Sequence, residues 1–372
     1  MKPTRRYAAG LAAIAVTAAG LLAGSAGSAS ASGSPAFVGP LHKTSVIAST
    51  VPGNGDVNPY GVFVVPRSTG FLYRGDVLVS NFNNKANMQG TGTTIVEVNP
   101  SGRHWVFASI PRNLRGCPGG VGLTTALTVL RSGWVIVGSL PTRGGAVSGA
   151  GCLIVLDQWG HVRETLAGHG INGPWDMGSL DLGGQAVLFV TNVLNGTVTA
   201  NGKTVDRGTV LRLVLKIPSR GLPFIWFDTT IGSGFPETLN SAALVIGPTG
   251  AGLGADDVLY VADTLDNRIA AIPDALFRAT SAGTGFTVSR GHHLNSELGL
   301  VIAPGGDILT VNGGNGNLVE TTPGGAQIAV RQLDSSGSPP GAGALFGLAV
   351  KPGQDAVYYV DDATNTLNLL HH

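Results

Sequence analysis

The chain has 372 residues, of which 12% are charged and 57 are glycine. Its 23 Lys and Arg nearly balance its 22 Asp and Glu. This balance argues against a nucleic-acid partner, because such proteins concentrate basic residues on one face, and against a polybasic membrane contact. Glycine weakens helix interiors, so the composition indicates many short strands joined by tight turns.

The first residues have the pattern of an export signal. Lys2, Arg5 and Arg6 precede the apolar run AAGLAAIAVTAAGLLAG, and the small residues of SAGSASASGSPA follow it. This order is typical of a secretory signal peptide. We therefore expect residues 1–32 to be a signal peptide and residues 33–372 to form a single domain, secreted and without a transmembrane segment.

The chain contains two cysteines, Cys117 and Cys152. In an exported chain such a pair is best read as a disulfide. The loop that it closes predicts a stabilisation of about 3–4 kcal/mol in the chain-entropy model.

A pattern of short apolar runs recurs six times along the chain. The first runs of the units are YGVFVVP, TALTVL, WDMGSLDL, AALVIGP, LGLVIAP and FGLAVKP. The second runs are DVLVSNFNN, GWVIVGSLPT, AVLFVTNVLNG, DVLYVADTLDN, DILTVNGGNGN and AVYYVDDATN. Runs of this length, rich in β-branched and aromatic residues and bounded by Gly, Pro, Asn and Asp, predict strands.

Four antiparallel strands per unit in six units predict an all-β fold, a six-bladed β-propeller. The chain ends after the third strand of the last unit, whereas the strand-like run KTSVIAST, residues 43–50, precedes the first unit. We expect this N-terminal strand to form the outer edge of the last blade and to close the ring, because an open edge would invite pairing with other chains.

Two acids of the fourth unit, Asp263 and Asp266, could be a site or part of the repeat. In register with Asp263 we place Asn81, Ser139, Asn192, Asn312 and Asp362, and in register with Asp266 we place Asn84, Thr142, Asn195, Asn315 and Asn365. Short polar side chains thus recur in the units at both positions. We interpret the two acids as turn residues that accept hydrogen bonds from nearby backbone N–H groups.

The segment GADDVLYVADTLDNRIAAI resembles an NHL repeat, in which a strand ending in Asp is followed by a turn with Asn and then by Arg-Ile. The chain as a whole is similar to six-bladed propellers of the SMP-30/gluconolactonase type. The resemblance implies a ligand site at one mouth of the central channel. It does not choose a reaction, because this fold carries several functions.

Residues that break the repeat at the expected channel mouth are candidates for a metal site. Asn58, Asp176, Asn240 and Glu297 could converge as two amides and two carboxylates, which are oxygen ligands that suit calcium. The set is similar in kind to the metal shell of gluconolactonase and arylesterase propellers. That resemblance implies a metal that polarises a lactone carbonyl and helps to activate water. The Glu-Gly-Pro-Trp-like motif of the gluconolactonase group is absent, and NPYG stands in its place.

Two further pairs lie near the predicted mouth. His292 and His293 could supply a catalytic general base, or they could be surface residues of a glycine-flanked loop. Tyr60 and Trp175 could bind a ligand by stacking against a carbohydrate, or they could seal the ring between blades.

Two functions are compatible with these features. The first is a secreted, monomeric binding or interaction module that holds a small molecule, glycan or extracellular protein at its channel mouth. The second is a calcium-dependent lactonase or ester hydrolase of the gluconolactonase/arylesterase type. The residues leave open whether the chain is an enzyme.

Overall fold

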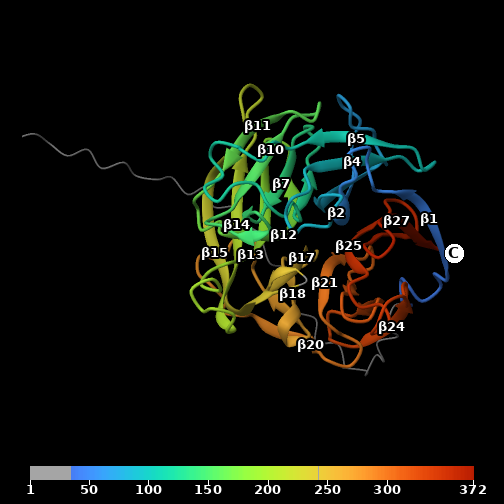
Figure 1. Cartoon of the computed structure of the whole chain (residues 1–372). Helices are drawn as coiled ribbons and strands as arrows, with labels where there is room; N and C mark the ends of the chain where they lie inside the picture. Colours follow the sequence, from blue (N-terminus) through green and yellow to red (C-terminus); the bar gives the residue numbers. More distant parts are fainter. Residues whose placement is uncertain (1–34, 242) are drawn as a thin grey trace, which may run out of the picture. The chain divides into compact units, whose positions relative to one another are not determined.

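In a computed structural model, the structure describes residues 35–241 and 243–372. The predicted signal peptide lies outside the described residues. The described part consists of strands and connecting loops, with one 3-10 turn, η1 (Thr264–Asp266), as its helical element (Figure 1). None of its elements is a helix long and apolar enough to cross a membrane.

Six antiparallel sheets, which we call blades 1 to 6, follow one another along the described chain. Blade 1 contains β2 (Val57–Val64), β3 (Val77–Asn83), β4 (Thr94–Val98) and β5 (His104–Ser109). Blade 2 contains β6 (Leu127–Val129), β7 (Val135–Ser139), β10 (Cys152–Leu156) and β11 (Val162–Leu166). Blade 3 contains β12 (Gly173–Asp181), β13 (Gln185–Val193), β14 (Val205–Lys216) and β15 (Phe224–Asn240).

The second half of the chain repeats the arrangement. Blade 4 contains β17 (Pro248–Leu253), β18 (Leu259–Asp263), β19 (Arg268–Ile272) and β20 (Phe286–Arg290). Blade 5 contains β21 (Glu297–Ile302), β22 (Ile308–Asn312), β23 (Asn317–Thr321) and β24 (Gln327–Gln332). Blade 6 contains β25 (Leu345–Val350), β26 (Val357–Asp361), β27 (Thr366–His371) and β1 (Lys43–Ser49). A small hairpin, β8 (Thr142–Arg143) and β9 (Ala146–Val147), projects from blade 2.

The predicted closure of the ring is confirmed. The N-terminal strand β1 pairs antiparallel with β27, with Lys43 opposite His371 and Ser45 opposite Leu369 (Figure 1). The innermost strands of successive blades also neighbour one another, and β25 returns to β2. The fold is therefore a six-bladed β-propeller, as the sequence predicts.

Burial explains why the second strands are nearly continuous apolar runs. The strands β3, β7, β18 and β22 are buried along their whole length, because each is covered on both faces by the neighbouring blades. The innermost strands approach one another closely at glycine. A Cβ atom on Gly347 would lie 1.9 Å from the carbonyl oxygen of Tyr60, and one on Gly299 would lie 2.5 Å from that of Phe346.

The predicted disulfide is present. Cys117, in the loop before β6, is bonded to Cys152 at the start of β10, and their Cα atoms are 5.2 Å apart. Both ends of the bond lie within blade 2, so it ties an otherwise long loop to a buried strand.

Two sequence assignments are wrong. The innermost strand of blade 4 is β17, not AALVIGP, from which Leu244–Ile246 forms β16 and pairs with the end of β15 as a fifth strand of blade 3. The sixth-blade residue in register with Asp263 is Asp361, not Asp362, because Leu345 pairs with Asp361 as Pro248 pairs with Asp263. The innermost strand β17, PTGAGL, has two glycines and few apolar residues, so the neighbouring apolar run is the stronger strand signal.

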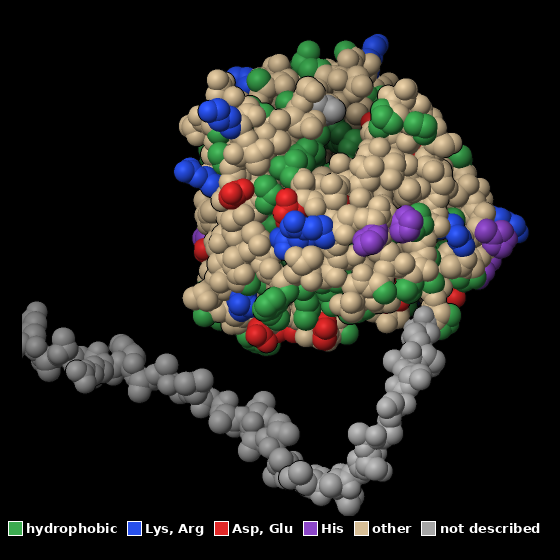
Figure 2. Space-filling view, turned by 90° about the horizontal axis from the view of Figure 1, so that it is seen from below, with side chains coloured by type: hydrophobic (Ala, Val, Ile, Leu, Met, Phe, Trp, Pro, Cys, Tyr) green, Lys and Arg blue, Asp and Glu red, His purple; other side chains and the backbone are tan. Residues whose placement is uncertain are grey.

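Charged side chains are scattered over the face that Figure 2 shows, and hydrophobic side chains line a hollow there. Red and blue groups stand singly or in small clusters, without a continuous basic area on that face. The view agrees with a chain in which only 12% of residues are charged.

Candidate functional site

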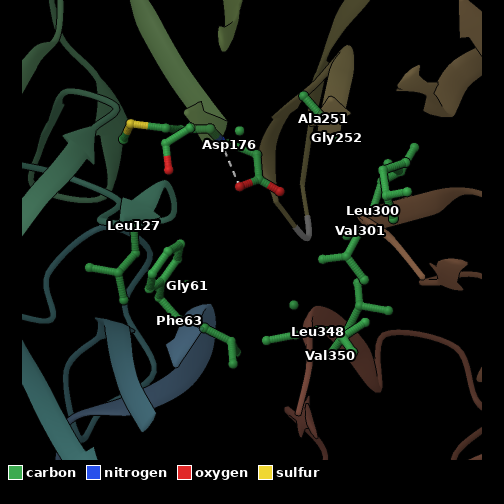
Figure 3. A pocket seen from close by; sticks show the side chains of 18 of the residues that line it. Gly61, Phe63, Leu127, Asp176, Ala251, Gly252, Leu300, Val301, Leu348 and Val350 are labelled. Atoms are coloured by element: carbon green, nitrogen blue, oxygen red, sulfur yellow. Dashed lines mark hydrogen bonds between the residues drawn. The ribbon is translucent and has the colours of Figure 1, made fainter. Parts of the chain in front are cut away.

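A cavity of about 370 Å³ lies on the propeller axis, between the innermost strands of the blades. Its walls are largely apolar and include Leu127, Leu300, Leu348 and Val350 (Figure 3). Glycines of β2, β12, β17, β21 and β25 complete the lining, so backbone borders much of the space. Such a cavity has the size and apolar character of a small-molecule site.

Asp176 is the one acidic or basic side chain among the described residues that line this cavity. It belongs to β12, where the register with β13 shifts between Pro174 and Asp176. A bulge of this kind re-aims side chains, and the carboxylate points into the space between the apolar walls (Figure 3). Its Oδ1 atom accepts a hydrogen bond of 2.7 Å from the backbone N–H of Met177.

The surroundings of Asp176 favour its neutral form. Desolvation in the cavity raises the pKa of Asp176 to about 7, although the hydrogen bond from Met177 opposes the shift. Within the described ranges this carboxylate forms no ion pair with Lys, Arg or His. A carboxyl group with a pKa near neutrality can both take up and release a proton at physiological pH.

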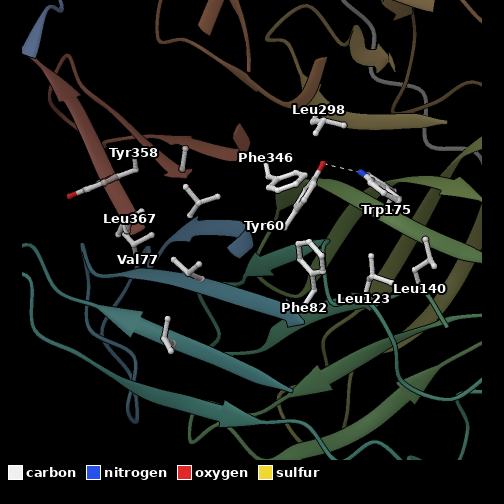
Figure 4. Packing of buried hydrophobic residues seen from close by; sticks show 14 of the residues in the cluster. Tyr60, Val77, Phe82, Leu123, Leu140, Trp175, Leu298, Phe346, Tyr358 and Leu367 are labelled. Carbon is white, nitrogen blue, oxygen red and sulfur yellow. Dashed lines mark hydrogen bonds between the residues drawn. The ribbon is translucent and has the colours of Figure 1, made fainter. Parts of the chain in front are cut away.

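An aromatic cluster fills the channel at the beginnings of the innermost strands (Figure 4). The indole Nε1 of Trp175 donates a hydrogen bond of 2.9 Å to the hydroxyl of Tyr60, and the two rings meet edge to face with centroids 6.0 Å apart. Phe346 lies against both Tyr60 and Phe82. Tyr60 itself lines the cavity, and the lining continues with the residues that follow Trp175 and Phe346, so the cluster forms one end of the cavity.

The carbohydrate-stacking hypothesis for Tyr60 and Trp175 does not fit this arrangement. Tyr60 is 2% exposed and Trp175 1% exposed, so neither ring offers an open face to a sugar. Their burial agrees with the alternative, in which the two side chains seal the ring between blades. Hydrophobic residues of β16 pack against the same cluster, which explains why AALVIGP is apolar without being an innermost strand.

The four predicted calcium ligands lie in different surroundings. Asn58 is buried at the start of β2, and its Nδ2 donates a hydrogen bond of 3.1 Å to Asp362. Asn240 is exposed at the end of β15, where its Oδ1 accepts the backbone N–H of Ala243. Of the four residues only Asp176 lines the central cavity.

Glu297 is fully buried at the start of β21, beside the ion pair between Asp263 and Arg268. Burial raises its pKa well above the ordinary value, although backbone N–H groups of Glu297 and Arg268 oppose the shift. The described residues contain no group of three or more His, Cys, Asp and Glu that could hold a metal ion. The residues present therefore do not fit the predicted calcium shell.

His292 and His293 are exposed in the loop between β20 and β21. They line a small surface pocket together with Ser289 and Gln327, and the backbone N–H of His293 donates to the Gln327 side chain. Neither histidine lines the central cavity, so a ligand bound there would not meet them. The surface-loop alternative describes their positions.

Asp263 and Asp266 are structural, but not through backbone turns as predicted. Oδ2 of Asp263 accepts hydrogen bonds of 2.9 and 2.7 Å from the buried guanidinium of Arg268. Asp266 forms an exposed ion pair of 2.8 Å with Arg290. The equivalent Asn312 instead bonds to Asn315, so different blades fix the same turn by different means.

Comparisons with known proteins identify the fold. A scan against protein-family models finds no match, and a search of curated proteins finds none either. A gluconolactonase of Xanthomonas campestris matches with a TM-score of 0.52 at 13% identity, over 85% of this chain and 87% of its own. A streptogramin B lyase matches with a TM-score of 0.51 at 16% identity, over 91% and 99%.

A calcium-binding protein of Agrobacterium tumefaciens, regucalcin, matches with a TM-score of 0.50 at 15% identity, over 89% of this chain and 93% of its own. At these identities the comparisons establish the architecture and not the chemistry. The chain is a six-bladed β-propeller of the form found in gluconolactonase and regucalcin, and Asp176 is the charged group of its central cavity.

Proposed function

We propose that the chain is a propeller hydrolase that opens a small lactone, or cleaves a small ester, in its central cavity. The observation that carries the proposal is the position of Asp176, a carboxylate without a counterion among apolar walls, with a pKa raised to about 7. The likeness to a gluconolactonase supports the substrate class. The volume of about 370 Å³ suits a molecule of few atoms.

In this reaction Asp176 acts as a general base and then as a general acid. The carboxylate takes a proton from a water molecule while the water oxygen bonds to the ester carbonyl carbon. The bond between that carbon and the leaving oxygen then breaks, and Asp176 returns the proton to the leaving oxygen. The products are a carboxylic acid and an alcohol, which form one hydroxy acid when the substrate is a lactone.

The likeness to regucalcin, described as calcium-binding, does not bring calcium into this proposal, because of the four residues predicted to hold it only Asp176 lines the central cavity. A chelator should consequently leave the thermal midpoint of the purified protein unchanged. A metal bound only by the native state would stabilise it, so a fall in the midpoint on adding chelator would show that a metal site exists.

A second candidate is a secreted module that binds a small molecule without converting it. The observation in its favour is that Asp176 is the single charged side chain in the described lining. The described lining therefore contains no second acidic or basic residue that could protonate a leaving oxygen. The Cys117–Cys152 bond supports a secreted location for either candidate, because disulfides persist in oxidising compartments.

The test is a panel of lactones and aryl esters with three proteins: the wild type, Asp176→Asn and Asp362→Asn. Asp362 is the matched control, because its pKa is also raised to about 7 and it does not line the cavity. We expect turnover by the wild type, a loss of about 10²–10⁴-fold in kcat for Asp176→Asn, and turnover close to wild type for Asp362→Asn.

Undiminished turnover by Asp176→Asn would overturn the hydrolase proposal. Saturable binding of a lactam analogue without turnover of any lactone or ester would favour the binding module. Calorimetric titration of the lactam into the same three proteins measures that binding.

A further inference from the structure

Blade 1 carries a second pocket, of about 770 Å³, that shares no lining residue with the central cavity. Its lining includes Phe71, Tyr73 and Trp105, together with Asp76, Asn99 and Arg103. The pocket lies over the loop before β3 and the turn between β4 and β5, two strands that Figure 1 shows in blade 1.

This pocket is formed where blade 1 departs from the repeat. Residues 65–76 connect β2 to β3, whereas the equivalent connections in the other blades are residues 130–134, 182–184, 254–258, 303–307 and 351–356. The symmetry of the propeller does not require the longer loop. An extended connection at one blade is a common place for a binding site on a rigid scaffold.

The longer loop is anchored to blade 2. The backbone N–H of Phe71 donates a hydrogen bond of 2.8 Å to the carbonyl oxygen of Gln158. The Phe71 ring meets the Trp159 ring edge to face, with centroids 4.9 Å apart. The loop is thus held on the neighbouring blade, and its side chains are pre-positioned.

Aromatic rings form the walls of the pocket. The Tyr73 and Trp105 rings lie edge to face with centroids 6.0 Å apart. Phe71 is 52% exposed and Tyr73 51% exposed, although aromatic residues make up only 6% of the chain. Exposed aromatic faces are costly to leave in water, and a cluster of them marks a binding surface.

An acid without an ion-pair partner lies among these rings. Asp76 lines the pocket and is 6% exposed, and within the described chain its carboxylate forms no ion pair with Lys, Arg or His. Burial raises the pKa of Asp76 to about 6, so the group is mainly ionised at neutral pH. A buried charge of this kind is normally paired.

A second acid, Glu97, lies close to Asp76. Glu97 of β4 is fully buried, and one of its oxygens accepts the backbone N–H of Tyr73 at 2.8 Å. Burial raises the pKa of Glu97 to about 8, and the charge of Asp76 adds to the shift. At neutral pH Glu97 is therefore mainly protonated, and Asp76 carries the negative charge of the site, with which no cation of the described chain forms an ion pair.

We propose that this pocket binds a small organic cation with an alkylated ammonium head. The faces of Phe71, Tyr73 and Trp105 attract such a cation through their π-electrons, and Asp76 supplies the counter-charge that the chain does not neutralise. Arg103 lines the rim, where it is exposed and forms no ion pair with Asp76. Its charge disfavours a cationic ligand, so its removal strengthens the binding.

The test compares choline with 3,3-dimethylbutan-1-ol, a probe of nearly the same shape in which a carbon replaces the charged nitrogen. Binding to the mature protein is followed by calorimetry and by tryptophan fluorescence. We expect saturable binding of choline and at least about tenfold weaker binding of the alcohol. Equal binding of the two probes would overturn the proposal, because it would reduce the pocket to an apolar surface.

Three variants locate the site. Asp76→Asn and Trp105→Ala should each weaken choline binding by about tenfold or more, whereas Arg103→Gln should bind choline at least as tightly as the wild type. Weaker binding by Arg103→Gln, or unchanged binding by Asp76→Asn, would contradict a cation site. Saturable binding of glucose without binding of choline would assign the pocket to carbohydrate and likewise overturn the proposal.

The wild type provides a check that does not depend on the folding of any variant. Choline binding should weaken as pH falls through about 6, because protonation of Asp76 removes the counter-charge. Binding that is independent of pH from 7 to 5 would contradict the role of Asp76. The alcohol probe, which carries no charge, should show no such dependence.

Discussion

Asp176 faces the central cavity because of a local irregularity in its strand. Its side chain replaces the small residues that other blades carry at this position, and that departure from the repeat is visible in the sequence. Its partners are not visible there. The register of β12, β2 and β21 shifts near the start of each strand, and a shift of one residue exchanges the face on which a side chain lies.

Glu297 occupies a different position along its strand, because it pairs with Asn312 as Pro174 pairs with Asn192, before the bulge that Asp176 follows. It is also an acid at the start of an innermost strand, and the sequence gives no sign that it differs from Asp176. In the structure it turns toward Asp263 and Arg268 instead of the cavity. Of the four predicted ligands, Asp176 is the one that lines the central cavity.

Replacing Asp176 should change how stability depends on pH. The folded state holds the proton of Asp176 up to a pKa of about 7, whereas the unfolded chain releases it near pH 4. The folded state therefore binds more protons than the unfolded chain between pH 4 and 7. The contribution of Asp176 to the free energy of unfolding is complete below pH 4 and is lost as the pH rises through 7.

Asp176→Asn keeps the shape and the hydrogen bond from Met177 but removes the charge. At pH 8 it should be more stable than the wild type by about 1–3 kcal/mol, less than the full shift implies because the carboxylate faces the cavity. At pH 4 the two should be alike. Urea unfolding at both pH values measures the difference, with the exposed Asp355→Asn as a control. Equal stability of variant and wild type at pH 8 would show that the carboxylate is not destabilising.

For the strands, apolar composition predicted correctly which segments are buried, but it did not always predict the blade to which a segment belongs. Val245 and Ile246 of the apolar run AALVIGP are buried because they pack in the aromatic cluster, yet they belong to blade 3 through the pairing of β16 with β15. The run PTGAGL, which forms β17, carries two glycines and little apolar surface. These positions are glycine because the neighbouring strand lies too close for a side chain. A search for apolar runs therefore misses the strand.

The hydrogen bond between Trp175 and Tyr60 should contribute to the stability of this aromatic cluster. Tyr60→Phe leaves the indole N–H buried without a partner, which should lower the free energy of unfolding by about 1–3 kcal/mol. Adding Trp175→Phe removes the orphaned donor, so the Tyr60→Phe substitution should cost less in a Trp175→Phe background than in the wild type. Denaturant unfolding of the two singles and the double provides the cycle, with exposed Tyr73→Phe as the control. An equal cost in both backgrounds would mean that the hydrogen bond does not couple the two rings.

For the whole molecule, the number of blades and the closing strand could be predicted because the same pattern of short apolar runs recurs in each repeat. The six sequence units form six blades, and the N-terminal strand that precedes the first unit pairs with β27. Function is not repeated in this way. The pocket of blade 1 depends on one long loop and on two acids, Asp76 and Glu97, whose burial no local pattern predicts. The one indication in the sequence was that residues 65–76 form a longer connection than the equivalent segments of the other units.

The disulfide should stabilise the propeller through blade 2. Cys117→Ala with Cys152→Ala should lower the free energy of unfolding by about 2–4 kcal/mol, because the loop between them gains freedom in the unfolded chain. The wild type under reducing conditions should lose a similar amount. A loss seen on reduction but not in the double variant would point to an effect of the free thiols instead of the cross-link.

Ring closure by the N-terminal strand makes the stability of the whole propeller depend on residues 35–50. Without them, β27 becomes an open edge, and Val38 and Leu41 no longer fill the cluster that they share with Leu309 and Tyr359. A chain of residues 51–372 should therefore lose its cooperative unfolding transition and aggregate, because an unpaired edge recruits other chains.

A circular permutant separates pairing from chain order. Joining His372 to residue 35 through a flexible linker, and beginning the chain at residue 51, keeps β1 available to β27 while placing it last in the sequence. We expect the permutant to unfold cooperatively and to remain monomeric, as measured by thermal unfolding and light scattering, whereas the truncated chain does neither. If the truncated chain folds as well as the permutant, five complete blades and three strands are enough to form the ring. The pairing of β1 with β27 would then not be required for the stability of the fold.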